Sequence, residues 1–278
     1  MWTVDGRKGR DSGDSEKGVP WSRQAEINSA VYESARVYRH YLSKFLTPVE
    51  IACLLKYRAF IFGRDVLDVG VGAGRTTLYL AQLARRYEAV DYSSVMVSYM
   101  KKAMPEISVQ QADFQDLGIF DEGSFDFVLA TNNVIDTLPH EGRLQALSEA
   151  HRVLRSGGLL AFSSHNIHYR KAFCGPQLGW SSNPLRLASN CVHYLFCWWN
   201  YLRVAPLRRT TSEYALLNDP GHYYACLHYY VARSTVSSQL ASVGLQLSDV
   251  FDTLGQVAPE AKDDSEHSSL LYVAKRAA

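Results

Sequence analysis

The sequence predicts an α/β fold in which helices cover both faces of a mostly parallel sheet. Three observations lead to this fold class. Short apolar runs alternate with amphipathic stretches from residue 65 to residue 164, polar or glycine-containing turns separate them, and two more apolar runs follow near the end of the chain. Strands that alternate with helices pair in parallel through right-handed crossovers. The 278 residues are enough for one such domain with elaborations.

The predicted strands are short and rich in apolar side chains. Their ranges are 65–69, 88–91, 107–113, 125–131, 159–164, 245–251 and 270–275. The last two are separated by a polar loop with too little helical pattern for another crossover, so they are expected to pair antiparallel. The predicted core is therefore a seven-stranded, mostly parallel sheet.

Apolar residues spaced near 3.6 predict the helices between these strands. Their ranges are 21–57, 76–86, 93–104, 140–155 and 234–243. Pro48 can open a second helix inside the first range, and Gly157-Gly158 is expected to end the helix before the fifth strand.

These elements suggest four regions. Residues 1–20 are charged and lack an apolar stretch, which argues against a signal peptide and predicts a disordered tail. Residues 21–60 are expected to form a helical lid, and residues 61–166 with 231–278 the core. Residues 167–230 are expected to be an inserted helical, aromatic cap. Its most apolar run, 191–202, is too short to span a bilayer and predicts a packed helix.

Charge and cysteine content exclude several function classes. Lysine plus arginine exceeds aspartate plus glutamate by one (29 against 28), so no global field favours nucleic acid or an anionic membrane. We therefore expect neither as a partner. The five cysteines are odd in number and form no Cys-x-x-Cys pair, so no metal site or disulfide framework is indicated. A reducing cytoplasm is the simplest setting.

The stretch "VLDVGVGAGRTTLYLAQLARRYEAVDYSS" carries the first functional signal. Its three glycines lie at the carboxyl end of the first strand, where open α/β sheets bind ligands. A triphosphate loop would end in Gly-Lys-Ser or Gly-Lys-Thr, whereas Gly74 is followed by Arg75. A dinucleotide fingerprint would place a small residue at Arg75, and the carboxylate of Asp68 would repel a pyrophosphate. A cationic ligand suits this loop better.

These motifs resemble those of class I S-adenosylmethionine-dependent methyltransferases, which have a Rossmann-like fold. The resemblance rests on five segments in order: "LDVGVGAG", "VDYS", "QADFQDL", "GSFDFVLATNNVIDTLPH" and "EAHRVLRSGGLLAFSSHN". It covers residues 65 to 166 without a gap and implies S-adenosylmethionine as the cofactor and a small molecule as the methyl acceptor.

The resemblance places the methionine part of the cofactor along Gly70, Gly72 and Gly74, where a side chain would collide with it. Asp68 is expected near the methionine amino group. Asp91 is expected on the ribose hydroxyls, because a carboxylate can accept two hydrogen bonds at once. The other expected cofactor contacts are Tyr92 and Met96 beside the adenine, Asp113 on its amino group, Phe114 nearby, Asn132 or Asn133 beneath the methionine part, and Tyr32 from the lid.

The acceptor atom decides whether a catalytic base is needed. A neutral amine or thioether needs none, whereas a hydroxyl does. We take His165, which follows the fifth strand, as the candidate base, and Tyr223 and Tyr229 from "GHYYACLHYY" as candidate pocket residues. Nitrogen, oxygen and sulfur acceptors all remain open at this point, as does the oligomeric state.

Three other functions were weighed. A module that binds the cofactor without catalysis would keep the same glycines and acids, and a nicotinamide-dependent oxidoreductase shares the glycine pattern. An RNA or protein methyltransferase is disfavoured because the charge is balanced and "TNNVID" follows the fourth strand in place of an Asn-Pro-Pro-Tyr-like motif.

Overall fold

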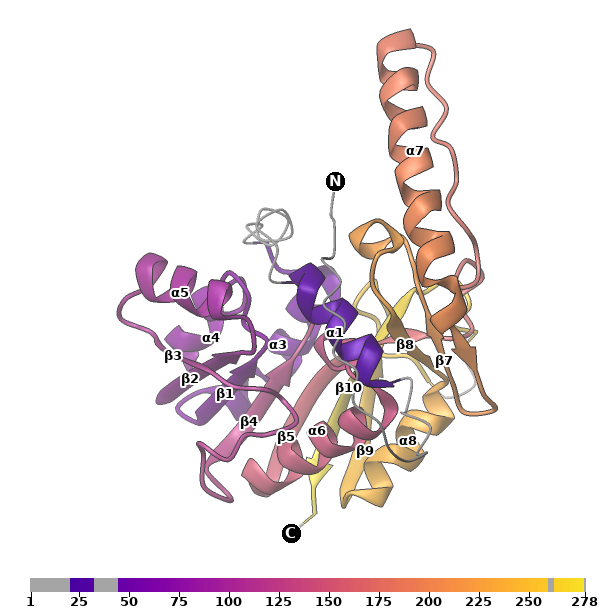
Figure 1. Ribbon diagram of the computed structural model, residues 1–278. Helices are drawn as coiled ribbons and strands as arrows, with labels where there is room; N and C mark the ends of the chain where they lie inside the picture. Colours follow the sequence, from indigo (N-terminus) through magenta and orange to yellow (C-terminus); the bar gives the residue numbers. More distant parts are fainter. Residues whose placement is uncertain (1–20, 33–44, 260–262, 278) are drawn as a thin grey trace, which may run out of the picture.

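One sheet of ten strands runs through the part of the molecule that the computed structural model describes, which is residues 21–32, 45–259 and 263–277 (Figure 1). The strands are β1 (Asp65–Val69), β2 (Arg86–Asp91), β3 (Ser108–Gln111), β4 (Phe125–Ala130), β5 (Leu154–Asn166), β6 (Arg209–Thr210), β7 (Tyr214–Leu217), β8 (His228–Val231), β9 (Leu245–Phe251) and β10 (Ser269–Arg276). The helices are α1 (Trp21–Tyr32), α3 (Pro48–Ile61), α4 (Thr77–Leu83), α5 (Ser94–Ala103), α6 (His140–Val153), α7 (Pro184–Val204) and α8 (Arg233–Ser242).

Seven of the ten strands form the predicted core. Strands β3, β2, β1, β4 and β5 pair in parallel in that order, and β10 joins β5 antiparallel with β9 on its outer side. The seven-stranded, mostly parallel, Rossmann-like sheet and its antiparallel last pair are therefore confirmed. The other three strands, β6 to β8, all come from residues 167–231.

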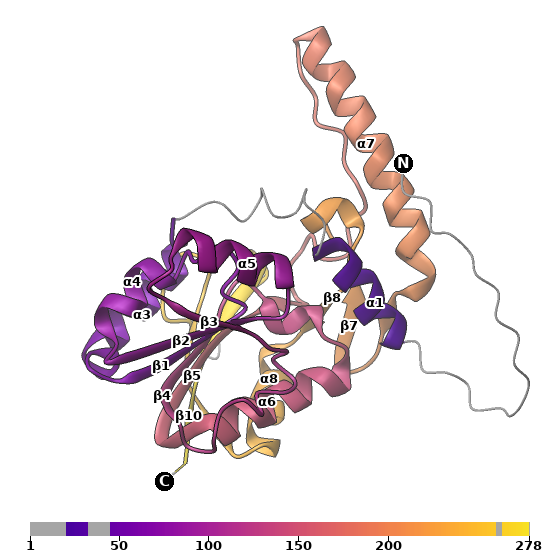
Figure 2. The same cartoon turned by 60° about the vertical axis from the view of Figure 1, so that its left-hand side comes forward.

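Apolar side chains on both faces of the sheet hold the helices in place. In β1 all five residues are buried, as expected for a strand with helices on both sides. Val66 packs in the cluster that includes α3 and α4, whereas Leu67 packs in the cluster that includes α6 and α8. Figure 2 shows these two helical layers.

Two helices lie in the described part of the range 21–57, which was predicted to be helical with a further helix opened by Pro48. Helix α1 ends at Tyr32, residues 33–44 lie outside the described residues, and α3 begins at Pro48 as expected. Thr47 and Glu50 form a capping box, in which the Thr47 hydroxyl accepts from the Glu50 amide and the Glu50 carboxylate accepts from the Thr47 amide. The cap explains why α3 begins where it does.

The glycine pair before the fifth strand lies inside that strand, so the prediction that it ends a helix is wrong. Helix α6 ends at Val153, and β5 begins at once and continues to Asn166. Gly157 has a φ of 77° at a register shift against β4, where β5 holds extra residues. A bulge of this kind needs a residue that tolerates positive φ.

The segment 167–230 extends the sheet instead of lying over it as a helical cap. β8 pairs in parallel with the last residues of β5, β7 pairs antiparallel with β8, and β6 with β7. β5 reaches beyond the end of β4, so its free edge is available to β8. The run 191–202 is helical, as predicted, but α7 projects away from the body (Figures 1 and 2), so the prediction that it is packed is wrong.

Candidate active site

The carboxyl ends of the parallel strands meet at one edge of the sheet. Asp91 ends β2, Gly70 follows β1, Asn132 follows β4 and His165 lies near the end of β5. Because β2, β1, β4 and β5 are successive neighbours, residues 65 to 166 place these side chains along a single cleft edge.

The three loop glycines are needed for different reasons. A Cβ atom on Gly70 would lie 2.5 Å from Val134, and one on Gly74 would lie 2.7 Å from the Met100 sulfur. Both collisions are with the protein itself. A Cβ atom on Gly72 would meet nothing within 4 Å, and its φ is 54°. Gly72 is thus the loop position that leaves space open for a ligand.

Asp91 lies next to this open position. Its carboxylate accepts hydrogen bonds from the amides of Gly72 (2.8 Å) and Ser93 (2.9 Å), one on each oxygen. Burial raises the pKa of Asp91, and the two amides oppose that rise. Each carboxylate oxygen keeps a further lone pair. The residue therefore has the acceptors that a ribose diol requires.

Asp68 is held behind the loop. Its side chain is 2% exposed, and one carboxylate oxygen accepts from the hydroxyls of Thr76 (2.5 Å) and Tyr87 (2.7 Å). Burial raises the pKa of Asp68 to about 6, against the lowering effect of the Thr76 and Tyr87 hydrogen bonds. This geometry offers no surface for direct contact with an ammonium group, so the expected role of Asp68 toward the methionine part remains a prediction.

The residues expected around the adenine fall into two groups. Met96 and Phe114 are each 4% exposed and pack inside the protein. Asp113 is exposed on the segment after β3, and its carboxylate accepts from the amide of Gln115 at 2.9 Å. Tyr92 is partly exposed directly after Asp91. Only Asp113 and Tyr92 present much surface here, and all four assignments stay predictions.

The two asparagines after β4 have an unusual backbone. Asn132 and Asn133 both have a φ of 59°, a left-handed conformation that asparagine tolerates better than most residues. The Asn133 amide donates to the hydroxyl of Ser163 (2.7 Å), and its side-chain nitrogen lies 3.1 Å from Nε2 of His165. The turn therefore links the end of β4 to the end of β5.

A buried carboxylate orients His165. The Nδ1 atom of His165 lies 2.7 Å from the Asp136 carboxylate, which also accepts from the His165 backbone amide. The other oxygen of Asp136 accepts from Arg143 (2.6 Å) and Ser164 (2.6 Å). Asp136 and Arg143 are both 0% exposed.

The charges in this network are balanced. Arg143 neutralises the buried carboxylate of Asp136, so the imidazole of His165 is not required as its counter-ion. With Nδ1 directed to Asp136, Nε2 is the atom that faces outward toward Asn133. Sequence reasoning missed Asp136, although it lies in the quoted stretch "TNNVIDTLPH". The available signal was a carboxylate that directly follows the apolar pair Val134-Ile135, shortly after the end of β4.

A second buried carboxylate, Asp219, lies opposite His165. It accepts from Nδ1 of His228 (3.0 Å), the hydroxyl of Tyr230 (2.8 Å) and the amide of Gly221 (2.9 Å), and it lies 3.6 Å from Nε2 of His165. Although burial alone would raise the pKa of Asp219, the adjacent imidazoles and hydrogen bonds hold it well below its usual range. Burial lowers the pKa of His228, but Asp219 outweighs this and raises it. Asp219 was also missed from the sequence.

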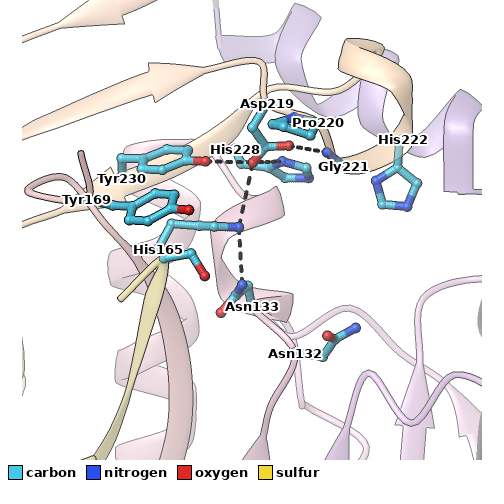
Figure 3. Close-up of a pocket in the computed structure, with 11 residues that line it drawn as sticks. Asn132, Asn133, His165, Tyr169, Asp219, Pro220, Gly221, His222, His228 and Tyr230 are labelled. Atoms are coloured by element: carbon cyan, nitrogen blue, oxygen red, sulfur yellow. Dashed lines mark hydrogen bonds and ion pairs between the residues drawn. The ribbon is translucent and has the colours of Figure 1, made fainter. Parts of the chain in front are cut away.

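These groups surround a pocket of about 340 Å³, which Figure 3 shows in close-up. Its wall is formed by Asn132, Asn133, His165, Tyr169, Asp219, Pro220, Gly221, His222, His228, Tyr230 and Ser268. Polar side chains dominate this wall, and both asparagines of the β4 turn belong to it. The pocket therefore begins at the cofactor edge of the sheet and extends under β8.

A strained turn presents His222 to the pocket. His222, Tyr223 and Tyr224 have successive φ values of 51°, 58° and 62°. Three consecutive non-glycine residues in the left-handed region cost free energy, and such strain is concentrated at functional sites. Tyr223 itself is 45% exposed and its ring contacts His193 of α7, so it does not line this pocket.

Tyr229 lies on the other face of β8. Neighbouring residues of a strand point to opposite faces, so His228 and Tyr230 face the pocket while Tyr229 faces α6. Its ring is 0% exposed, stacks with Tyr214 and has its hydroxyl 2.8 Å from His140. The expectation that it lines the acceptor pocket is corrected by this geometry. The side chain of Tyr32, the expected lid contact, lies outside the described residues.

Helix α1 nevertheless reaches the site region. The side chain of Asn28 pairs with the backbone of Leu227 in both directions (2.8 and 3.0 Å) and donates to the carbonyl of Thr137. Residue 227 directly precedes β8, and residue 137 ends the turn that carries Asp136. The N-terminal helix thus docks on both walls of the candidate site.

Among the residues that the structure describes, two groups of side chains could hold a metal ion. His222, Cys226 and His228 place one donor atom each within 4.8 Å of one another, and so do His165, Asp219 and His228. Nitrogen and sulfur donors suit zinc. The second group is already satisfied by hydrogen bonds to Asp219, and burial raises the pKa of Cys226, which opposes the thiolate form. Hydrogen bonds and an ion pair with Asp219 therefore account for the close contacts within the second group.

The fold and the strand-end motifs define a class of protein, and comparison with known sequences agrees. A family model described as "Methyltransferase domain" matches residues 66–158. Residues 66–158 thus match a methyltransferase domain, in agreement with the class of protein that the strand-end motifs resemble.

Two curated relatives each match a little more than a third of the chain. A probable S-adenosylmethionine-dependent methyltransferase of Mycobacterium tuberculosis is 37% identical over 103 residues, which are 37% of this chain and 36% of the relative. The malonyl-[acyl-carrier protein] O-methyltransferase of Pectobacterium atrosepticum is 30% identical over 105 residues, 37% of this chain and 39% of the relative. The chain thus spans little more than a third of the length of these relatives.

Solved structures share the fold over most of the chain. The 1,6-didemethyltoxoflavin-N1-methyltransferase of Burkholderia thailandensis, solved with S-adenosylhomocysteine, has a TM-score of 0.57 at 15% identity and covers 96% of this chain and 94% of its own. The CcbJ methyltransferase of Streptomyces caelestis has a TM-score of 0.58 at 16% identity and covers 90% and 99%.

Proposed function

We propose that the protein transfers the methyl group of S-adenosylmethionine to a hydroxyl group of a small, polar acceptor, with His165 as the general base. The observation that carries this proposal is the orientation of His165. Its Nδ1 is fixed on the buried Asp136, and its Nε2 faces the pocket. A hydroxyl acceptor needs a base at this place, whereas a neutral amine does not.

The cofactor supplies a methyl group on a sulfonium, which is a good leaving system. Asp91 has acceptors for the ribose hydroxyls, and Gly72 leaves the space beside it open. The chain's own residues then have to hold the acceptor in line and exclude water. When bound, the cofactor would supply the methyl group to the acceptor oxygen, and Nε2 of His165 would accept the hydroxyl proton.

The pocket supports a small acceptor rich in polar groups. Its volume of about 340 Å³ is in the range of sites for small molecules. Asn132, Asp219 and His222 place an amide, a carboxylate and an imidazole in the pocket wall, and such groups suit a polar acceptor better than an apolar one. Helix α1, which docks on both walls, is the proposed lid that closes the site.

The test is turnover of a panel of hydroxyl and amine acceptors with methyl-labelled cofactor. We expect His165→Ala to lower turnover by ~10²–10⁴ with little change in cofactor affinity. His168→Ala is the matched control, because His168 is exposed three residues further along the same segment and should leave turnover unchanged. Transfer to amines that persists at full rate in His165→Ala would contradict a hydroxyl acceptor and a base role.

A further inference from the structure

Residues 173–207 form an arm that leaves the body of the molecule (Figures 1 and 2). The arm consists of an extended segment and helix α7, which lie side by side. The Asn190 side chain donates to the carbonyl of Gly179 at 2.7 Å, and Gly175 lies against Tyr201. At its base, the Asn200 side chain donates to the carbonyl of Tyr223 at 3.0 Å. The arm is thus tied to the strained turn beside the pocket.

The arm exposes more large apolar side chains than a solvated helix needs. Leu185 is 83% exposed, Trp199 is 69% exposed and Trp180, on the extended segment, is 81% exposed. The other exposed apolar residues of the arm are Phe173, Leu178, Val192, Leu195, Phe196 and Leu202. Residues 185, 192, 195, 199 and 202 follow spacings of three, four and seven residues, so they share one face of α7. A continuous apolar face of this kind marks an interaction surface.

The charge of the arm shows which partner fits this face. Residues 167–212 contain no aspartate or glutamate, and their cationic residues are Arg170, Lys171, Arg186, Arg203, Arg208 and Arg209. Arg186 and Arg203, on α7 itself, are exposed. The chain as a whole has a formal net charge of only +1, so the positive charge of this segment is balanced elsewhere.

We propose that the arm binds the surface of an anionic membrane. Its apolar face would enter the headgroup region, while the exposed Arg186 and Arg203 contact lipid phosphates. Tryptophan, here Trp180 and Trp199, suits this boundary because its ring is apolar and its N–H is polar. The proposal goes beyond the proposed function and does not depend on His165 being a base.

Two other arrangements fit less well. A second copy packed on the same face would bring cationic side chains together without an acidic partner on either arm, which is unfavourable. A membrane-spanning arrangement lacks support, because no helix among the described residues is long and apolar enough to cross a bilayer. Binding to the membrane surface requires neither an acidic partner on a second copy nor a membrane-spanning helix.

The test is co-sedimentation of the full-length protein with vesicles. One set contains phosphatidylglycerol and phosphatidylcholine in equal amounts, and the other contains phosphatidylcholine alone. We expect binding to the anionic vesicles that weakens at raised ionic strength, because salt screens the phosphate contacts. The double variant Leu195→Glu/Trp199→Glu should bind at least ~10-fold more weakly, and so should Arg186→Glu/Arg203→Glu.

Leu254→Glu is the matched control. Leu254 is also highly exposed (66%) but lies in the turn after β9, away from the arm, so its replacement should leave vesicle binding unchanged. Circular dichroism and cofactor affinity check that each variant is folded. Equal binding of the parent protein and the Leu195/Trp199 variant would overturn the proposal. So would a dimer that fails to bind vesicles and dissociates in that variant, since it identifies a second copy as the partner.

Discussion

The strand edge that carries the cofactor motifs and the arm at residues 173–207 contain similar apolar residues in opposite surroundings. Every residue of β1 is buried between two helical layers, whereas α7 buries only Cys197, Asn200 and Val204 along 21 residues. Both segments look like core in the sequence. The comparison shows that the apolar content of a segment predicts that its side chains will be buried, but does not predict which surface buries them. The side chains of β1 are buried by helices of the same chain, whereas the exposed face of α7 would be buried by the proposed membrane surface.

The largest expected contrast between the two regions is in stability. Phe127→Ala removes a ring that is 0% exposed in β4, and it should lower the free energy of unfolding by about 3–5 kcal/mol through lost burial and a residual cavity. Urea unfolding followed by circular dichroism measures this. A loss below ~1 kcal/mol would mean that the core around β4 is far less tightly packed than the structure shows.

A pH-dependent change of similar size in the free energy of unfolding is expected from Asp68. Burial raises its pKa from 3.8 to about 6, so the folded state binds this proton more tightly than the unfolded state does. Its contribution is therefore most favourable below pH 3.8, falls by ~3 kcal/mol as the pH rises to about 6, and is constant above that. The stability difference between Asp68→Asn and the parent protein should grow across this window in favour of the variant. A difference that is flat with pH would contradict a raised pKa.

At the cofactor edge, Asp91→Ala should weaken S-adenosylmethionine by about 1.5–3 kcal/mol, the range for lost hydrogen bonds to a charged group. The reason is that Asp91 combines open lone pairs with the unobstructed space at Gly72. Isothermal titration calorimetry measures the affinity. Since Asp91 also accepts from the Gly72 amide, the folded content of the variant has to be checked, and unchanged affinity in a folded variant would remove Asp91 from the site.

The smallest expected effect is in the arm. Trp199→Ala should change the free energy of unfolding by less than ~0.5 kcal/mol without lipid, because the ring is 69% exposed and loses little burial. The same urea titration as for Phe127→Ala gives a direct comparison. A cost near that of a core residue would show that the face of α7 is already covered in solution, and would remove the contrast on which the membrane proposal depends.

Particular residues show how far the sequence could predict the site. The glycines, Asp91 and His165 could be proposed from the sequence because each lies at a fixed offset from a strand that local pattern reveals. Asp136 and Asp219 were missed because their role comes from contacts with residues distant along the chain. Asp136, which follows β4, contacts His165 near the end of β5. Asp219 contacts both His165 and His228. Tyr229 was assigned to the pocket because composition does not show to which face of a strand a side chain points.

The sequence by itself determined the alternating strands and helices, the antiparallel last pair and the position of the cofactor motifs, because these depend on periodicity and short spacing. Only the tertiary structure decided that residues 167–231 extend the sheet, that Asp136 and Asp219 approach His165 from two sides, and that α7 leaves the body. The physical reason is that β8 can pair only with the edge of β5 that β4 leaves free. That pairing decides which side chains of the segment enter the pocket and which remain exposed on the arm.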